Sequence, residues 1–414
     1  YTGVQRIDKL LEDNLDIVFI SSFSYSAQLA YALSNYFQSR GTVTVLGGPH
    51  ARSYPDDACL YFDYVLGLTD KELLRDLLHS FESNKPPGAY LSASSHPQSL
   101  PGVRERWEFI EQLHKSPLIF KALPMIGSFG CPHKCDFCIE ADIPYQSLDL
   151  GVIKEDLQFL VKNMKRPVVG WHDPNFGIQF NSFMDTLESA VPPGSINFIG
   201  QCTIASLSEA RVKRLKKNGF IFIAVGVESW FDYGGKAKAK SVTGMDKVRR
   251  VAEQLNMVQQ HIPSVQANIM YGFDNESGSD PFTLTKRFIE HAPGVYPAYN
   301  ILTAFGHGLK HYSQNEIDKR IVPFPFHMML GLNTLNIKPK NYSWEEFYTH
   351  YLDLLKYSFS PGVMYRRHRA VPFRASRWFN LFLSFSVGGS GKKRNVQTIL
   401  KNLRTKPDFR AFMN

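Results

Sequence analysis

Three cysteines within eight residues are the feature of this sequence with the clearest chemistry. The stretch CPHKCDFC holds Cys131, Cys135 and Cys138, three of the five cysteines in the chain. Thiolates are soft ligands that suit zinc or an iron–sulfur cluster, and a short loop with three of them can surround one centre. His133 lies in the same loop, so one alternative is a zinc site of the Cys3His type. The other is a 4Fe-4S cluster with three protein ligands and one open iron position.

The elements that must position this loop alternate between short apolar runs and helical patterns. Six βα units in succession predict a barrel or partial barrel, in which functional groups lie on loops after the carboxyl ends of the strands. The cysteine loop directly follows the first of these strands. The predicted strands are 123–129, 167–173, 196–200, 221–227, 265–272 and 299–305, and the clearest helices between them are 152–164, 206–219 and 245–256.

The cysteine spacing in this context resembles the signature of the radical SAM superfamily. The match consists of C-x3-C-x2-C, with Phe137 before the last cysteine, and the resemblance covers about residues 117–310. It implies a 4Fe-4S cluster on the three cysteines, with S-adenosylmethionine (SAM) bound to the open iron. It also implies that an electron from the cluster cleaves SAM into methionine and a 5'-deoxyadenosyl radical. The protein then has to hold that radical against one C–H bond of a substrate.

The same resemblance implies further cofactor-binding residues along the barrel. Asp173, in WHDPNFG, stands where the superfamily holds the amino group of SAM, although an aspartate before proline is also typical of a turn. Gln201 is a second polar candidate after the third strand. Glu228 and Ser229, in VGVES, match a stretch expected to meet the ribose or the amino acid part of SAM. The segment 271–278, YGFDNESG, contains the glycine used for close approach to adenine.

The first 85 residues predict a separate, doubly wound parallel α/β domain of the Rossmann-like type. A strand there ends in GGPHA, and this turn before a radical SAM barrel resembles the cobalamin-binding subfamily. The resemblance implies that Gly47, Gly48 and His50 lie at the carboxyl edge of the sheet, where such sheets hold ligands. Two features depart from the subfamily: GLTDKE stands at 67–72 in place of a GEGE-like turn, and the sequence has no D-x-H-x-x-G motif.

The cobalamin resemblance implies methylation of an unactivated carbon. One SAM would methylate the cobalt of cobalamin and a second would generate the radical. Cyclisation or rearrangement by a radical SAM enzyme is one alternative. A zinc-stabilised, non-catalytic binding protein is another, and it predicts a colourless protein that does not turn over SAM.

The composition is that of a folded globular protein with several domains. With 43% hydrophobic residues in 414, a large core is available. The chain begins at Tyr1 rather than at a methionine, so we expect the first domain to be truncated at its amino end. The predicted parts are a cobalamin-binding-like domain at 1–85, a linker at 86–115, the radical SAM partial barrel at 116–310 and a helical, basic region at 311–414.

The clustering of the cysteines argues against a disulfide framework and favours a reducing compartment, so we expect a cytoplasmic protein. The expected partners are a small-molecule or lipid-like substrate and an electron donor such as flavodoxin or ferredoxin. We expect no sequence-specific nucleic-acid binding, because no recognised module accompanies the basic residues.

The carboxyl-terminal region combines basic and aromatic residues. From residue 366 to the end there are 12 lysines and arginines against one acid, Asp408, although the whole chain has a net charge of only +9. Ser343 and Glu346 form a capping box, which predicts the start of a helix. The segment 374–394 holds several aromatic residues between basic ones, so it is either a buried element or a peripheral membrane contact.

Overall fold

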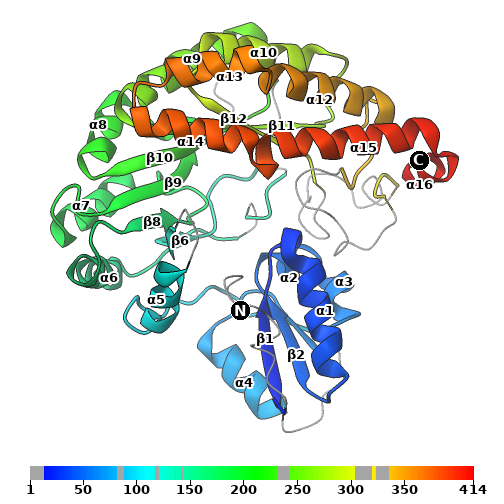
Figure 1. Ribbon diagram of the computed structural model, residues 1–414. Coiled ribbons are helices and arrows are strands. Elements are labelled where there is room, and N and C mark those ends of the chain that lie inside the picture. The colour runs from blue at the N-terminus through cyan, green and yellow to red at the C-terminus, as the bar shows by residue number, and fades with distance from the viewer. Residues whose placement is uncertain are drawn as a thin grey trace.

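The computed structural model confirms the predicted α/β architecture and its helical carboxyl-terminal region (Figure 1). An amino-terminal parallel sheet lies beside a six-stranded parallel sheet that curves as a partial barrel, with helices on its outside. The amino end of the predicted first domain, residues 1–13, and residues 304–318, which include the end of the last predicted strand, are not among the residues that the structure describes. The structure describes residues 14–81, 88–116, 121–135, 137–140, 143–231, 242–303, 319–322 and 335–414.

The amino-terminal sheet has four parallel strands in the order β1-β2-β3-β4. Its centre is apolar because parallel strands are covered on both faces, and Val45 and Leu46 of β2 are fully buried. The strands are β1 (Ile17–Ser21), β2 (Val43–Gly47), β3 (Tyr64–Leu66) and β4 (Ala89–Leu91). The helices between them are η2 (Ser24–Ser26), α1 (Ala27–Gln38), α2 (Pro49–Ser53), α3 (Pro55–Cys59) and α4 (Lys71–Phe81).

The stretch expected to be a linker contains two ordered elements. Strand β4 pairs with β3, with Tyr64 opposite Ala89, so the first sheet continues past residue 85. Helix α5 (Trp107–Lys115) buries Ile110 in the main hydrophobic core with the barrel residues. The connection between the two sheets is therefore shorter than the predicted 86–115.

The barrel sheet has six parallel strands in the order β12-β11-β10-β9-β8-β5, as the six predicted βα units require. A short antiparallel hairpin, β6 with β7, follows β5. The strands are β5 (Leu123–Met125), β6 (Ser128–Phe129), β7 (Gln146–Ser147), β8 (Val168–Trp171), β9 (Asn197–Thr203), β10 (Phe220–Glu228), β11 (Ser264–Tyr271) and β12 (Tyr296–Ile301).

Amphipathic helices cover the outside of this sheet and place their apolar faces on it. In α6, Ile153, Leu157 and Leu160 recur at helical spacing and are all buried. The side chain of Asp149 caps the amino end of α6 by accepting a hydrogen bond from the Gly151 N–H at 2.7 Å. The helices are α6 (Leu150–Asn163), α7 (Phe180–Ala190), η3 (Ile204–Ser206), α8 (Glu209–Lys217), α9 (Gly244–His261) and α10 (Asp280–His291).

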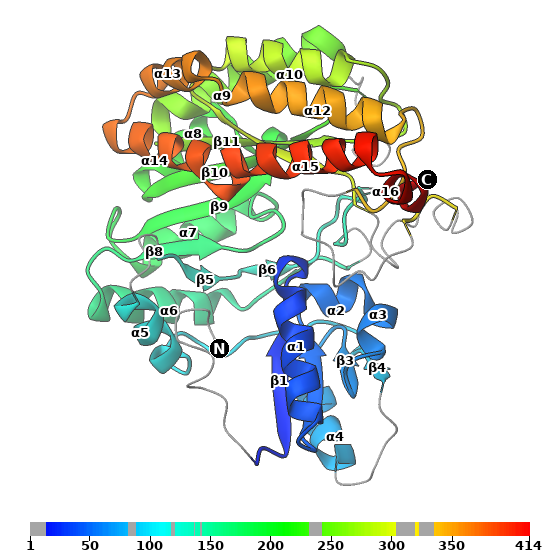
Figure 2. The same cartoon turned by 45° about the vertical axis from the view of Figure 1, so that its right-hand side comes forward.

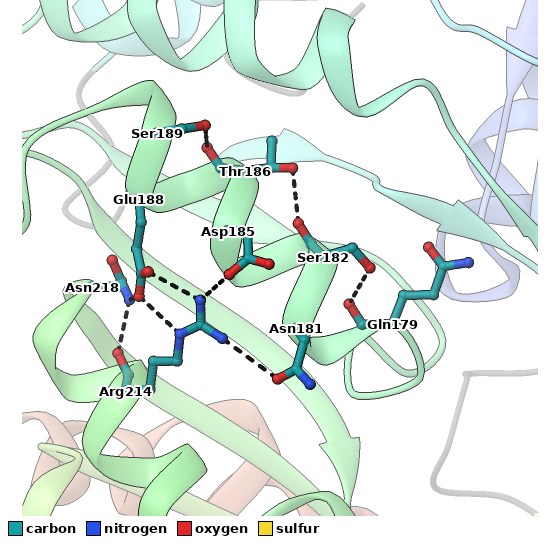
Figure 3. Close-up of polar contacts among 9 residues, drawn as sticks. All are labelled: Gln179, Asn181, Ser182, Asp185, Thr186, Glu188, Ser189, Arg214 and Asn218. Atoms are coloured by element: carbon teal, nitrogen blue, oxygen red, sulfur yellow. Dashed lines mark hydrogen bonds and ion pairs between the residues drawn. The ribbon is translucent and has the colours of Figure 1, made fainter.

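A polar network joins two of these helices on the outer surface. Figure 3 shows the Arg214 guanidinium of α8 between acidic side chains of α7, with its Nε 2.9 Å from Glu188 Oε1. Asn218 also donates to Glu188, at 2.8 Å. These donors lower the pKa of Glu188 to about 2. The network fixes the spacing of neighbouring βα units far from the cysteine loop.

The carboxyl-terminal helices follow the barrel, and α14, η5 and α15 run one after another in line (Figure 2). Ser343 caps α12 as predicted: its Oγ accepts from the Glu346 N–H at 3.2 Å. In the part of the chain that the structure describes, no helix is long and apolar enough to span a membrane. The helices are α12 (Trp344–Ser358), α13 (Pro361–Ala370), α14 (Arg374–Phe385), η5 (Val387–Gly391), α15 (Lys392–Thr405) and α16 (Pro407–Met413).

Candidate active site

The cysteine loop leaves the carboxyl end of β5 and passes through the β6–β7 hairpin. Gly130, immediately before the first cysteine, has φ +64°, a left-handed backbone conformation. A Cβ at this position would lie 2.3 Å from the Pro144 carbonyl oxygen, so only glycine fits. The Cys131 N–H donates to the Ile143 carbonyl at 3.4 Å, and the Cys138 N–H donates to the Cys135 carbonyl at 3.0 Å. These two bonds fix the backbone at the first and the last of the three cysteines.

None of the three cysteines is in a disulfide, and the loop brings their thiols into electrostatic range of one another. Cys135 is buried, and burial raises the pKa of the Cys138 thiol to about 12. A metal centre replaces such protons when it binds, so the loop carries the soft donors that an iron–sulfur cluster needs. Among the described residues, no three His, Cys, Asp or Glu side chains are already gathered around one point, so the three thiols would have to draw together as a cluster binds.

Asp173 follows β8 and holds the start of the cysteine loop. Its carboxylate accepts from the Gly127 N–H at 2.9 Å and from the Ser128 hydroxyl at 2.6 Å. The residue is only 3% exposed, and burial raises the pKa of its carboxyl although these hydrogen bonds oppose the shift. Both carboxylate oxygens are therefore used within the protein, a role that the sequence did not indicate.

A second buried carboxylate organises the loop after β11. Glu276 is 1% exposed and accepts from the Gly272 N–H and from the Ser229 hydroxyl, both at 2.8 Å. Burial raises the pKa of Glu276 to about 7. The ring of Phe273 in this loop meets the ring of Phe137 in the cysteine loop at a centroid distance of 5.6 Å. The sequence offered one indication of Glu276, an acid four residues after a glycine at a strand end.

Two further predicted SAM-binding residues line the same end of the barrel. Glu228 is the last residue of β10 and has φ +63°, beside a register shift between Gly226 and Glu228. A strained backbone conformation persists only where the surrounding structure enforces it, and such residues are concentrated at functional sites. Gln201 in β9 is exposed, and its Nε2 donates to the Asp173 carbonyl at 3.1 Å. In contrast, Ser229 is 1% exposed and is used by Glu276.

Neutral amide side chains line the inner face of the sheet. Along β11, Gln266 and Asn268 are partly exposed and alternate with buried residues that pack under the outer helices. The Gln266 Nε2 donates to Asn268 Oδ1 at 2.8 Å. Asn300 on the neighbouring β12 is also partly exposed. The inner face therefore offers donors and acceptors without net charge, which the apolar runs in the sequence did not reveal.

The carboxyl edge of the amino-terminal sheet carries the predicted GGPHA turn. A Cβ on Gly47 would meet nothing within 4 Å, so this backbone is open to close approach. Gly48 has φ +88°, and a Cβ there would lie 2.7 Å from Ser21 Oγ. His50 is fully buried, with Nε2 3.2 Å from the Tyr31 hydroxyl and Nδ1 3.1 Å from Ser24 Oγ. Its ring thus stabilises the turn from the buried side.

Direct contacts join this edge to the cysteine loop. Arg52, in the helix after Gly48, forms an ion pair of 2.8 Å with Glu140, two residues beyond the last cysteine. The two side chains are only 20% and 17% exposed. The ring of His96 stacks on Phe129 at a centroid distance of 4.0 Å. The glycine turn and the cysteine loop therefore face one shared region, where α2 lies next to the cyan loop of the barrel (Figure 1).

Comparison with known proteins identifies what this arrangement resembles. Residues 125–284 match the Radical SAM superfamily. Two methyltransferases of Chlorobaculum tepidum are similar to the chain, one for bacteriochlorophyllide d C-12(1) and one for C-8(2). The first is 21% identical over 89% of this chain and 80% of its own length. The second is 24% identical over 73% of this chain and 70% of its own length.

A solved structure has the same overall fold. It is the radical SAM methyltransferase TsrM from Kitasatospora setae, with cobalamin and a [4Fe-4S] cluster bound. The TM-score is 0.60 at 13% identity, over 95% of this chain and 89% of that one. These matches favour an enzyme over the zinc-stabilised binding protein that the sequence left open.

Proposed function

Because residues 125–284 form a radical SAM domain and the chain is a radical SAM enzyme, we propose that it is a cobalamin-dependent methyltransferase acting on an unactivated carbon. Such a domain works with a 4Fe-4S cluster and SAM. The similarity to the two bacteriochlorophyllide methyltransferases over most of the chain supports methyl transfer. The likeness in fold to TsrM, which was solved with cobalamin, supports a role for the amino-terminal domain in binding that cofactor.

When bound, the cluster supplies the electron that cleaves SAM, and cobalamin supplies the methyl carrier. In this proposal Cys131, Cys135 and Cys138 hold the cluster. The backbone at Gly47 would allow the corrin ring to approach the carboxyl edge of the first sheet, because a Cβ there would meet nothing within 4 Å. His50 would support the turn rather than ligate cobalt, since both of its ring nitrogens are hydrogen-bonded within the protein.

The barrel residues orient the reactants and exclude water. Asp173 fixes the start of the cysteine loop, and Glu276 fixes the glycine turn after β11. Gln201 and Glu228 remain at the open end of the barrel, where they can meet SAM. The amides Gln266 and Asn268 face the interior, so a neutral small molecule with a few hydrogen-bonding groups fits this wall better than a multiply charged one.

The single observation that carries the proposal is the ion pair between Arg52 and Glu140. It joins the helix after the glycine turn to the loop with the cysteines, at 2.8 Å. Cofactors at the two sites would therefore share one reaction space. Without such a joint, the amino-terminal domain could be a separate structural unit.

The chemistry also requires a source of electrons and a reducing environment. We propose a small electron-transfer protein, such as flavodoxin or ferredoxin, as the donor. The described cysteines form no disulfide, which supports a cytoplasmic location, because reduced cysteines are typical of reducing compartments.

The decisive experiment compares wild-type protein with Gly47→Val and Gly362→Val. The purified enzyme is reconstituted with iron, sulfide and hydroxocobalamin under anaerobic conditions, and bound cobalamin is measured after gel filtration. Gly47→Val should lose most of its cobalamin yet still produce 5'-deoxyadenosine, because it fills the open edge without backbone strain. Gly362→Val, on α13 and also open within 4 Å, should bind cobalamin as wild type does.

The proposal fails if wild-type protein retains no cobalamin. It also fails if Gly47→Val binds cobalamin as well as the control does. Loss of both cobalamin and 5'-deoxyadenosine in Gly47→Val, with the control intact, would point to misfolding. A Gly47→Ala variant, which adds one methyl group, would then decide, because it should weaken cobalamin retention without affecting the fold.

A further inference from the structure

Helix α14 buries small polar residues and exposes three of its four aromatic residues. Trp378, Phe382 and Phe385 are 66%, 58% and 63% exposed. The residues that α14 buries are instead small and polar: Ser376, Asn380 and Ser384. An ordinary surface helix has the opposite arrangement, with its apolar face on the core.

Hydrogen bonds on the buried side fix this orientation. The Ser384 hydroxyl accepts from the Arg367 guanidinium at 3.2 Å, and Asn380 donates to the Gly294 carbonyl at 3.4 Å. Arg367 is itself only 1% exposed. Rotating α14 to bury its aromatic residues would break both contacts. The buried guanidinium would keep Ser358 but lose Ser384 as an acceptor, and an unsatisfied buried donor is costly. The aromatic face therefore stays exposed.

The exposed side chains form one continuous stripe. Arg374, Trp378, Phe382 and Phe385, here called the α14 stripe, follow one another at spacings of three and four residues. On a helix of about 3.6 residues per turn they fall within an arc of about 80°. The stripe extends to α13, because the ring of His368 meets that of Trp378 at 5.4 Å.

Basic residues precede and follow the stripe in the sequence. From Arg366 to the end, the chain has 12 lysines and arginines against the single acid Asp408. Some of these cations are used internally, such as Lys392, which is buried, and Arg404, which pairs with Glu345. Besides Arg374 within the stripe, the exposed basic residues nearest to it in the sequence are Arg366, Arg369 and Arg394.

We propose that the α14 stripe docks the protein on the surface of a bilayer that contains anionic phospholipids. Tryptophan and phenylalanine insert at the level of the headgroups, while arginines around them meet lipid phosphates. This charge complementarity favours a membrane over a second copy of the chain, since two such basic surfaces would repel each other. The inference does not rest on the chemistry proposed for the barrel.

The location of α14 is compatible with activity at the membrane. Asn380 contacts Gly294, just before β12, and the ring of Phe379 meets Phe222 of β10 at 6.3 Å. Both contacts lie toward the amino ends of the strands. The cysteine loop follows the carboxyl end of β5, so docking through α14 leaves the cofactor sites open.

The test is flotation of the full-length protein with vesicles of phosphatidylglycerol and phosphatidylcholine, compared with vesicles of phosphatidylcholine alone. Wild type should float with the anionic vesicles and much less with the neutral ones. The triple variant Trp378→Ser, Phe382→Ser, Phe385→Ser should bind the anionic vesicles at least about tenfold more weakly, because it removes the inserted aromatic area. A charge variant, Arg369→Gln, Arg374→Gln, Arg394→Gln, should lose binding by a similar factor.

A matched control removes exposed apolar groups from the amino-terminal domain: Tyr25→Ser with Leu60→Ser, at positions 75% and 78% exposed. It should bind vesicles as wild type does. Equal flotation of the triple variant and this control would overturn the inference, and so would equal binding to neutral and anionic vesicles. Sedimentation without lipid tests whether a second copy of the chain covers the stripe instead. A dimer that the triple variant abolishes would assign the stripe to self-association and overturn the inference.

Discussion

Replacing Asp173 tests whether this residue is an anchor for the cysteine loop or a ligand for SAM. The sequence resemblance implies that its carboxylate holds the amino group of SAM. In the structure the carboxylate is 3% exposed and accepts from the Gly127 N–H at 2.9 Å and the Ser128 hydroxyl at 2.6 Å. Asp173→Ala removes both acceptors, whereas Asp173→Asn keeps the shape and removes the charge.

The expected magnitude follows from these two hydrogen bonds. A hydrogen bond to a buried charged group contributes about 1.5–3 kcal/mol, so Asp173→Ala, which loses two, should destabilise the loop by about 3–6 kcal/mol. That is a large share of the roughly 5–15 kcal/mol of a typical domain. In Asp173→Asn, the amide oxygen can still accept from Gly127 and the amide nitrogen can donate to the Ser128 hydroxyl, so the loss should be about 1 kcal/mol.

The assay is the iron and sulfide content after anaerobic reconstitution, together with the affinity for SAM. An anchor predicts that Asp173→Ala loses most of its iron, while Asp173→Asn keeps the cluster and binds SAM nearly as well as wild type. A ligand predicts instead that Asp173→Asn keeps its iron but loses affinity for SAM. Full iron content in Asp173→Ala would refute the anchoring argument.

Two further predictions concern pH and buried charge. Burial raises the pKa of Glu276 from 4.5 to about 7, so the folded state holds the proton more tightly, and stability should fall by about 3 kcal/mol as pH rises across this window. Glu276→Gln should flatten that slope in denaturant titrations, and an unchanged slope would contradict the assignment. Burial lowers the pKa of Lys392 from 10.5 to about 8, so the unfolded chain binds more protons, and stability should rise by about 3 kcal/mol between these values. Lys392→Met should remove this rise in stability. The test compares the unfolding midpoints at pH 7.5 and 10, and a rise that persists in the variant would contradict the prediction.

Most of the fold was predictable because its strands and helices follow from local sequence patterns, such as apolar runs and helix-capping residues. The apolar runs that predict the barrel strands coincide with six parallel strands, and the capping box at Ser343 starts α12. Strand β4 was missed because its three residues, Ala89–Leu91, lie in a stretch rich in Pro, Gly and Ser. Pairing with β3, about 25 residues away, makes it a strand, and such pairing leaves no periodic trace in the sequence.

The candidate site was predictable in its positions but less so in its contacts. Sequence reasoning placed His50 near a ligand edge, but its ring contacts Tyr31 and Ser24, which come from elements before the glycine turn. It also left the orientation of α14 open, since aromatic residues are nearly continuous there. The buried Arg367, from another helix, selects which face points outward.

The carboxylates near the site follow one physical rule. Asp173 and Glu276 are both almost fully buried, and each accepts hydrogen bonds from backbone N–H and serine hydroxyl groups of a loop beside the site. A buried charge must find donors inside the protein, so such a residue is already occupied before a ligand arrives. Groups that can still reach a cofactor or substrate are instead those with exposed surface, such as Gln201 and Asn268. Exposure, which sequence motifs do not report, is therefore what separates anchors from ligands in this barrel.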